Sequence, residues 1–448
     1  MKTGRKGISR REMLKTAATL GAAGAAGIGA NIVIPGRAKA AKKLTILQWQ
    51  HFVPGYDEWF NKTYIKEWGQ ANDTEVTVDN IAGGQVSTRA AAEASAKKGH
   101  DLFMHLNPNP VYEELVIDHR EVYEEVERKW GKPIDLAIKS TYNPKTKKYF
   151  GFSDMYVPDP INYRKDLWDE AGMNPDSWDN IRKGGAKIRK ARGIPVGIGL
   201  ANELDTAMAI RAMMYANGAS EQDAEGNLTI KSKATLDTLK FAKAMYQESM
   251  EAEVLSWDIS SNNRAMLAGT ISIALNAISI TRGGENAKNP IHKDIWLNKA
   301  AKGKVRQMGL EHVMSVYQIW EFAENKEGAK KFLVDLISNY QRAFDASEFY
   351  NFPCFLKTVP NLQEQIKKDS KADPPDKYAV LGDSLKWATN VGYPGYAHAA
   401  IGEIFETWVL NTMFAEAATG NQTPEAALDR AHKKCEAIWK KWKDRKLI

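Results

Sequence analysis

Short apolar runs alternate with segments of helical periodicity along most of the chain. The runs Leu44–Trp49, Glu75–Asp79 and Asp101–Leu106 have the length of strands, and apolar residues in the segments between them recur every three to four positions. Parallel strands need a crossover connection, which is usually helical, so this opening predicts a β-α-β-α-β unit with a parallel sheet. The expected fold class is α/β, with parallel or mixed sheets and flanking helices.

The same alternation continues through the second half of the chain. Strands are predicted over Ile194–Leu200 and Thr270–Leu275, and a further strand that crosses between domains over Val313–Phe322. Ala329 to Tyr340 carries a helical apolar stripe, and a last helix begins after Thr423, a good N-cap residue followed by proline.

Tyr156 to Tyr163 is extended in pattern but contains two prolines. Proline removes a hydrogen bond from the middle of a sheet, so this segment favours a hinge or an interdomain strand over a central strand.

The N-terminus has the three parts of an export signal. Ser9–Lys15 fits the twin-arginine motif, Ala17–Ile34 is a mild apolar run, and Ala38–Ala40 is a small-x-small cleavage site. We expect residues 1–40 to be a twin-arginine signal peptide and the mature protein to work in the periplasm. A membrane-spanning or amphipathic helix is the alternative, but a glycine-rich run of this length is a poor span.

Removing that segment changes the charge balance. The chain has 62 Lys+Arg and 55 Asp+Glu, but residues 1–40 hold eight of the basic residues and one acid, which leaves 54 of each. The basic balance of the whole chain therefore gives no reason to expect nucleic acid as a partner. The remaining length of about 400 residues predicts two domains. Cys354 and Cys435 could form a disulfide in an exported protein or be two packed thiols.

Four segments carry a resemblance to a known family. Lys43–Trp49 with the helix after it, Val157–Trp178, Arg264–Ile273 and Gly420–Leu428 occur in the expected order, although the glycine of the third motif follows its methionine. In these segments the chain resembles the family 1 extracellular solute-binding proteins of ABC importers, the group that includes maltodextrin-binding protein. The resemblance implies a two-lobed periplasmic-binding-protein-like fold of type II, in which a multi-strand hinge lets the lobes close over a ligand.

The resemblance also implies the domain division and the partners. The N-terminal lobe is expected to comprise residues 41–157 and 317–350, and the C-terminal lobe residues 158–316 and 351–448. The protein is expected to be a monomer without a cofactor or metal. Its partners would be a small-molecule solute, the membrane subunits of an ABC permease and the twin-arginine export machinery, with no nucleic acid.

Candidate ligand-binding residues lie mainly where predicted strands end, because α/β sheets bind ligands outside the carboxyl ends of their strands. The resemblance supplies the choice of loops. The candidates are Trp49, Gln50, His51, Asn107, Asp159, Asn202, Asp205, Asn276, Trp320, Tyr393 and Tyr396. Several have a purely structural alternative: Trp49 and Trp320 also suit a core, Asn107 a turn before Pro108, and Asp159 a turn cap.

Aromatic faces combined with neutral hydrogen-bonding groups favour a sugar or oligosaccharide as the ligand. The same aromatic residues could instead enclose a cationic amine, with Asp159 or Asp205 as the counter-ion. An exported carbohydrate-active enzyme is the third possibility. No C-x-x-C, H-E-x-x-H or G-x-S-x-G motif occurs, but two distant catalytic carboxylates would leave no such motif. We therefore expect a binding protein without enzymatic activity.

Overall fold

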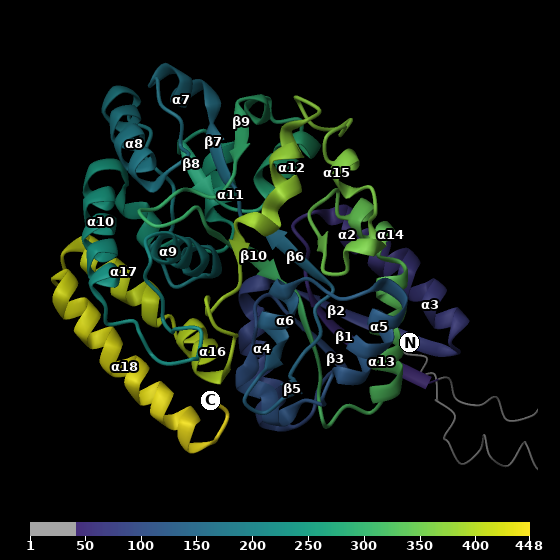
Figure 1. Cartoon of the computed structure of the whole chain (residues 1–448). Coiled ribbons are helices and arrows are strands. Elements are labelled where there is room, and N and C mark those ends of the chain that lie inside the picture. Colours follow the sequence, from purple (N-terminus) through teal and green to yellow (C-terminus); the bar gives the residue numbers. More distant parts are fainter. Residues whose placement is uncertain (1–41) are drawn as a thin grey trace, which may run out of the picture. The chain divides into compact units, whose positions relative to one another are not determined.

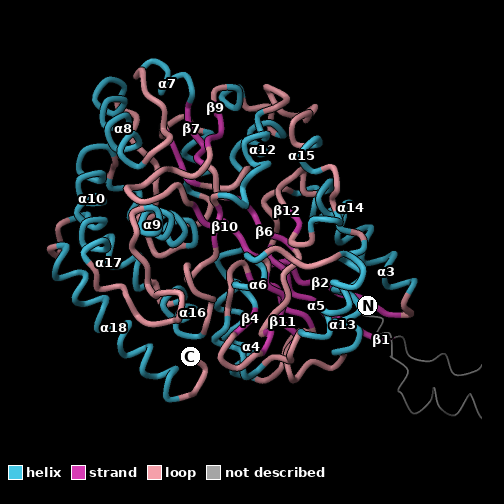
Figure 2. Tube along the Cα trace, in the orientation of Figure 1, coloured by secondary structure: helices cyan, strands magenta, loops and turns pink. Residues whose placement is uncertain are grey.

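The structure is a computed structural model that describes residues 42–448. Within this range, four sheets are formed, and helices lie on either side of them (Figures 1 and 2). The signal peptide predicted for residues 1–40 lies outside the described residues. No helix between residues 42 and 448 is long and apolar enough to span a bilayer.

The first sheet has the order β11-β3-β1-β2. The strand β1 (Lys42–Trp49) pairs in parallel with β2 (Thr74–Ile81) and β3 (Leu102–His105), as the alternating pattern predicts. The strand β11 (Val316–Ile319) returns much later in the chain and runs antiparallel to β3. The β-α-β-α-β opening is confirmed.

A second sheet, with the order β12-β6-β10-β13, connects the first sheet to the rest of the fold. Its strands are β6 (Met155–Pro158), β10 (Gly309–Met314), β12 (Phe352–Pro353) and β13 (Ala388–Thr389). The chain passes between the two regions through β6 and β10. After β6, the chain enters β7 (Ile161–Arg164) of a third sheet, where β7 pairs with β8 (Ile273–Leu275) and β9 (Ile295–Asn298). The proline-containing segment therefore passes from one sheet to another. We call β6 and β10 the hinge strands. The division into lobes given above stays a prediction.

Helix α9 (Leu204–Ala216) is the buried centre of the second half of the fold. It is buried on all sides because it packs against β10, α10 (Lys233–Ser249) and α17 (Val409–Thr419). Its N-cap, Glu203, accepts hydrogen bonds from the backbone N–H groups of Asp205 and Thr206. The last helix, α18 (Pro424–Asp444), is capped by Thr423, which confirms the predicted start.

The remaining elements are shorter or lie on the periphery of these groups. They are α2 (Pro54–Trp59), η1 (Phe60–Tyr64), α3 (Ile65–Ala71), η2 (Gly83–Gln85), α4 (Val86–Ala96), η3 (Pro110–Leu115), α5 (Arg120–Trp130), α6 (Asp135–Thr141), β4 (Tyr142–Asn143), β5 (Lys148–Tyr149), α7 (Lys165–Glu170), α8 (Trp178–Arg192), η4 (Ala252–Leu255), α11 (Ser261–Leu267), α12 (Ser279–Asn286), η5 (Pro290–Lys293), α13 (Lys326–Ser338), α14 (Tyr340–Ala346), η6 (Leu356–Thr358), α15 (Leu362–Gln365), η7 (Lys377–Lys386) and α16 (Ala399–Glu406).

Two strand predictions are corrected. Residues 194–200 form no strand, although backbone bonds join Gly197 to Ile273 and Ser272 to Pro195, so the segment runs extended beside β8. The strand predicted over Val313–Phe322 is divided at Ser315, because its first part belongs to β10 and its second to β11. Cys354 and Cys435 are buried free thiols, and they form no disulfide with each other.

Candidate ligand-binding cavity

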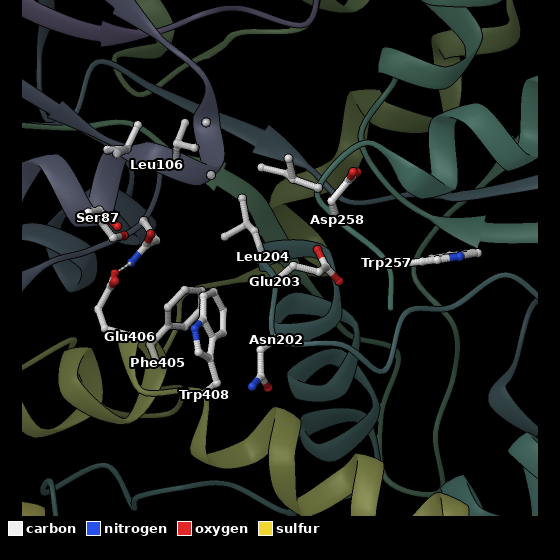
Figure 3. A pocket seen from close by; sticks show the side chains of 16 residues that line it. Ser87, Leu106, Asn202, Glu203, Leu204, Trp257, Asp258, Phe405, Glu406 and Trp408 are labelled. Carbon is white, nitrogen blue, oxygen red and sulfur yellow. Dashed lines mark hydrogen bonds between the residues drawn. The ribbon is translucent and has the colours of Figure 1, made fainter. Parts of the chain in front are cut away.

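A cavity of about 420 Å³ lies between the loops after β2 and β3 on one side and the N-terminus of α9 on the other (Figure 3). The loop after η4 and the junction of α16 with α17 complete its wall. The lining residues are Gly83, Gly84, Val86, Ser87, Thr88, Leu106, Asn107, Asn202, Glu203, Leu204, Trp257, Asp258, Ile259, Phe405, Glu406 and Trp408. This volume suits a small organic ligand.

Aromatic rings approach the cavity from two directions. Phe405 and Trp408 lie together, with ring centroids 6.0 Å apart and planes tilted by 44°, and Trp257 lies on the other side of Glu203 and Asn202 in Figure 3. Trp408 has φ 55° and ψ 33°, a left-handed conformation that is strained for a bulky side chain. This conformation lets the chain break between α16 and α17 while both rings face the cavity.

Three carboxylates line the same cavity. Glu203 is held by the backbone N–H groups at the start of α9, and Asn107 donates to Oε1 of Glu406 at 3.1 Å. The exposed side chain of Asp258 is paired with Arg264 at 2.9 Å, and this bond lowers the pKa of Asp258. Burial raises the pKa of Glu203 and of Glu406, since both are partly withdrawn from water.

A buried ionisable group lies behind Glu203, at the hinge strands. Nδ1 of His312, on β10, is 3.2 Å from Oδ1 of Asp159, and its Nε2 is 3.4 Å from Oδ1 of Asp205. Burial alone would lower the pKa of His312, but the charges of Asp205, Asp159 and Glu203 outweigh it, and the pKa is raised. The pKa of Asp205 is raised well above its usual range by burial and by the charge of Glu203. We call His312, Asp159 and Asp205 the hinge triad.

A chain of buried amides extends from the hinge triad. Asn262 donates to Asp205 at 2.7 Å, and the amide of Asn276 donates to Asn262 at 2.8 Å and to Asn263 at 2.6 Å. Because these partners come from different elements, the network fixes the loop after β8 against α9 and α11.

The predicted site residues are partly brought together. Asn107 and Asn202 line the cavity. Asp159, Asp205 and Asn276 are buried and lie in the polar network behind it. A role in ligand binding stays a prediction for all five residues. Asn107 and Asn202 could contact a ligand directly, whereas Asp159, Asp205 and Asn276 could act only through the residues in front of them.

Three candidates, the last residue of β1 and the two that follow it, are not in the cavity lining. Trp49 is 2% exposed and packs on Phe52, His51 and Tyr350, while Gln50 is exposed and donates its backbone N–H to Ile81. His51 is buried, and its Nε2 is 3.0 Å from Asn351 Oδ1; burial lowers its pKa to about 4. The geometry of Trp49 matches its structural alternative, core packing, and a binding role for the three residues stays a prediction.

The late aromatic candidates also lie elsewhere. Trp320 is fully buried and stacks on Phe322. Tyr393 lines a different, smaller pocket, where it lies beside Arg306, and Tyr396 forms a T-shaped ring pair with Tyr142. None of the three lines the cavity described above.

The sequence reasoning missed most of the aromatic and acidic lining. Trp257 and Asp258 follow a short helix rather than a strand, and Glu406 and Trp408 stand at a helix–helix junction. The run Phe405-Glu406-Thr407-Trp408 gives a signal, because charged and polar residues interrupt an apolar helical pattern there. A search confined to strand ends could not find it.

Sheets joined by the hinge strands, with helices on either side, form the α/β arrangement of two-lobed periplasmic binding proteins. The chain belongs to the bacterial extracellular solute-binding protein family, whose model matches residues 54–343, more than half of the 448 residues. The family resemblance and the α/β fold expected from the sequence are thereby confirmed.

Relatives of known name are distant. An arabinooligosaccharide-binding protein of Bacillus subtilis (strain 168) is 25% identical over 216 residues, which are 44% of this chain and 45% of that protein. Maltose-bound MalE3 of T. maritima has a similar structure, with a TM-score of 0.73, 19% identity, and coverage of 89% of this chain and 100% of that one. A solute-binding protein of Agrobacterium radiobacter K84 in complex with ribitol has a TM-score of 0.69 at 17% identity, with coverage of 89% and 98%. These likenesses show the fold.

Proposed function

We propose that the protein is a periplasmic receptor that binds a sugar or short oligosaccharide and delivers it to an ABC permease by closure of its cleft. The observation that carries the proposal is the cavity of about 420 Å³, in which Trp257, Phe405 and Trp408 stand around carboxylate and amide groups. Sugars present apolar C–H faces and a ring of hydroxyl groups, so they match a wall of this mixed kind.

Individual residues have natural roles in this proposal. The indole faces of Trp257 and Trp408 would cover the ring of the sugar, while Glu203 and Asn107 would accept or donate hydrogen bonds to its hydroxyls. Glu203 is suited to this role because the N–H groups of α9 hold its carboxylate in one place. A binding group that is fixed in advance loses less entropy when the ligand arrives.

Closure is supported by the close approach of Gly83 to Ile259, which comes from another wall of the cavity. A Cβ atom on Gly83, which follows β2, would lie 3.2 Å from Leu106 Cδ1 and 3.3 Å from Cδ1 of Ile259, on the loop after η4. Glycine therefore allows the two sides to approach closely. Closure of hinged domains around a ligand is a common way to report binding, here to a permease. We further propose that the protein is a monomer without enzymatic activity, exported by the twin-arginine pathway.

The direct test is titration of the mature protein with mono- and oligosaccharides, polyols, cationic amines and amino acids, followed by intrinsic fluorescence. Saturation at micromolar ligand, a binding free energy of about −8 kcal/mol, with the ligand recovered unchanged, is expected for a sugar. Turnover of a sugar would contradict the receptor function, and saturation by amino acids alone would contradict the sugar.

Trp257→Ala is expected to weaken sugar binding. Loss of a stacked aromatic face removes about 1.5–3 kcal/mol, which corresponds to a rise in Kd of roughly 10- to 150-fold. The matched control is Trp296→Ala: Trp296 is also half-buried, but it lies on β9 beside Lys165, outside the cavity lining. Calorimetric titration of both variants should show a loss for Trp257→Ala alone, and equal losses would remove Trp257 from the site.

Gly83→Val is expected to hinder closure. A Cβ there is already closer to Leu106 and Ile259 than an ordinary van der Waals contact, so the two further carbon atoms of valine would push these side chains away. We expect weaker sugar binding and a smaller ligand-induced decrease in the radius of gyration, measured by small-angle X-ray scattering. Gly283→Val is the control, because a Cβ on Gly283 meets only Leu267 Cδ1 at 3.8 Å and Gly283 is not among the lining residues. An unchanged closure in Gly83→Val would place the moving contact elsewhere.

A further inference from the structure

The charge of the cavity lining is one-sided. Glu203, Asp258 and Glu406 line it, whereas no lysine, arginine or histidine occurs among its lining residues in the described chain. Arg264 balances only Asp258, whose exposed side chain is at the rim. Charges of one sign in a partly enclosed, low-dielectric cleft concentrate the field on the ligand.

The two inner carboxylates have no cation of their own. Within residues 42–448, Glu203 and Glu406 form no ion pair, and their hydrogen bonds come from neutral donors, which are N–H groups and, for Glu406, also the hydroxyl of Ser87. The charge of His312 reaches Glu203, but His312 is already contacted by Asp159 and Asp205. A buried carboxylate without a paired cation is costly, and a ligand that brings a positive charge removes that cost.

We infer that the ligand is an amine-bearing saccharide, whose ammonium group is attracted by the charges of Glu203 and Glu406 and whose ring is covered by Trp257 and Trp408. This inference rests on the proposed function and narrows the substrate class to amino sugars and their short oligomers. Both carboxylates offer acceptor lone pairs to an N–H donor, so a primary ammonium fits better than a quaternary one. Uronic acids and phosphorylated sugars are excluded by repulsion from the same carboxylates.

Raised carboxyl pKa values agree with this reading. Burial raises the pKa of Glu203 and Glu406, which means that their hydrogen bonds compensate the charged forms only in part. A bound ammonium favours the charged form, so binding should release protons at mildly acidic pH. A neutral sugar would bring no such charge.

The experiment compares related saccharides that carry a positive, a neutral or a negative group. Glucosamine and its β-1,4-linked dimer are titrated beside their N-acetylated forms, beside glucose and cellobiose, and beside glucuronate, with the full mature protein in a calorimeter. A charged hydrogen bond is stronger than a neutral one by about 1–1.5 kcal/mol, so the amino form is expected to bind roughly 5- to 13-fold more tightly than its neutral counterpart.

Variants localise the effect to the two inner carboxylates. Glu406→Gln removes the charge of that carboxylate, and Glu203→Gln removes the charge together with one of the two oxygens that cap α9. In each variant the ratio of the affinity for the amine to the affinity for its neutral counterpart should fall to about one. The matched control is Glu403→Gln. Glu403 lies on α16, as Glu406 does, but it pairs with Lys441 outside the cavity. The preference of this variant should remain that of the unaltered protein.

Each outcome decides a different statement. Equal or tighter binding of glucose, an N-acetylated sugar or glucuronate overturns the amine inference and leaves the proposed function standing. A preference that survives in Glu203→Gln and in Glu406→Gln also overturns it, because the ammonium would then lie elsewhere. Failure of every saccharide to bind, while a folded protein is shown by circular dichroism, removes the proposed function itself.

Discussion

Replacement of His312 by glutamine lowers the free energy of unfolding by about 3 kcal/mol near pH 5.5 and by clearly less near pH 9. His312 is the only cation of the hinge triad, with ring nitrogens 3.2 Å from Asp159 and 3.4 Å from Asp205. Its removal leaves two buried carboxyl groups facing each other. Breaking a buried pair by removing one partner typically costs about 3–5 kcal/mol, and the amide of glutamine recovers a part of this.

The direction of the pH dependence follows from the raised pKa of His312. A histidine whose pKa is higher in the folded than in the unfolded protein contributes stability that is fully present below about 6.5, its unfolded value. That contribution is lost as the pH rises through the folded pKa. The raised pKa of Asp205 acts in the same direction, since its protonated form is favoured by folding.

The quantity to measure is the difference in the free energy of unfolding between the unaltered protein and His312→Gln, because other histidines change the stability in the opposite direction with pH. Burial lowers the pKa of His51 to about 4, of His105 to about 3 and of His119 to about 4, so these residues destabilise the fold when the pH falls below about 6.5. They contribute equally to both proteins and cancel in the difference. Urea unfolding at pH 5.5, 7 and 9 supplies the values.

A surface histidine provides the control. His432 on α18 is partly exposed and lies 3.4 Å from Glu436, so His432→Gln should change the free energy of unfolding by less than about 0.5 kcal/mol. A loss for His312→Gln that is the same at all three pH values would show that the histidine acts by packing alone.

The fold was largely predictable because its signals are local. The run Leu44–Trp49 and the Thr423–Pro424 cap each specify an element through residues that are neighbours in the sequence, and both appear as predicted. Residues 194–200 show the limit: their apolar pattern is that of a buried strand, but pairing depends on the geometry of β8 and the loop beside it. Ser315 likewise marks a change of sheet that periodicity cannot show.

The candidate site was less predictable because its walls come from segments that are distant in the sequence. The polar strand ends Asn107 and Asn202 follow from the topology of α/β sheets, and both line the cavity. Trp257 and Trp408 reach it from loops between helices, for which no comparable rule exists. Trp49 illustrates the converse, since a strand-end tryptophan is buried wherever the following loop folds over it.

Replacement of Trp408 by glycine abolishes most of the affinity for the ligand while the fold keeps its stability. The indole lies at the cavity and packs on Phe405, and its loss is expected to raise Kd by roughly 10- to 150-fold, the equivalent of about 1.5–3 kcal/mol. Glycine adopts φ 55° without the penalty of about 1–2 kcal/mol that a left-handed conformation costs other residues. The relief of strain therefore offsets the lost packing in the unfolding free energy.

Trp408→Ala separates the two effects. Alanine removes the indole but keeps a Cβ in the left-handed conformation. This variant should bind the ligand as weakly as Trp408→Gly, and its free energy of unfolding in urea should be about 1–2 kcal/mol lower than that of Trp408→Gly. Equal stability of the two variants would mean that the backbone relaxes and that no strain is held at this position. If Trp408→Gly is more stable than Trp408→Ala and both lose the ligand, the left-handed conformation at position 408 is strained and is retained because it points an aromatic ring at the ligand.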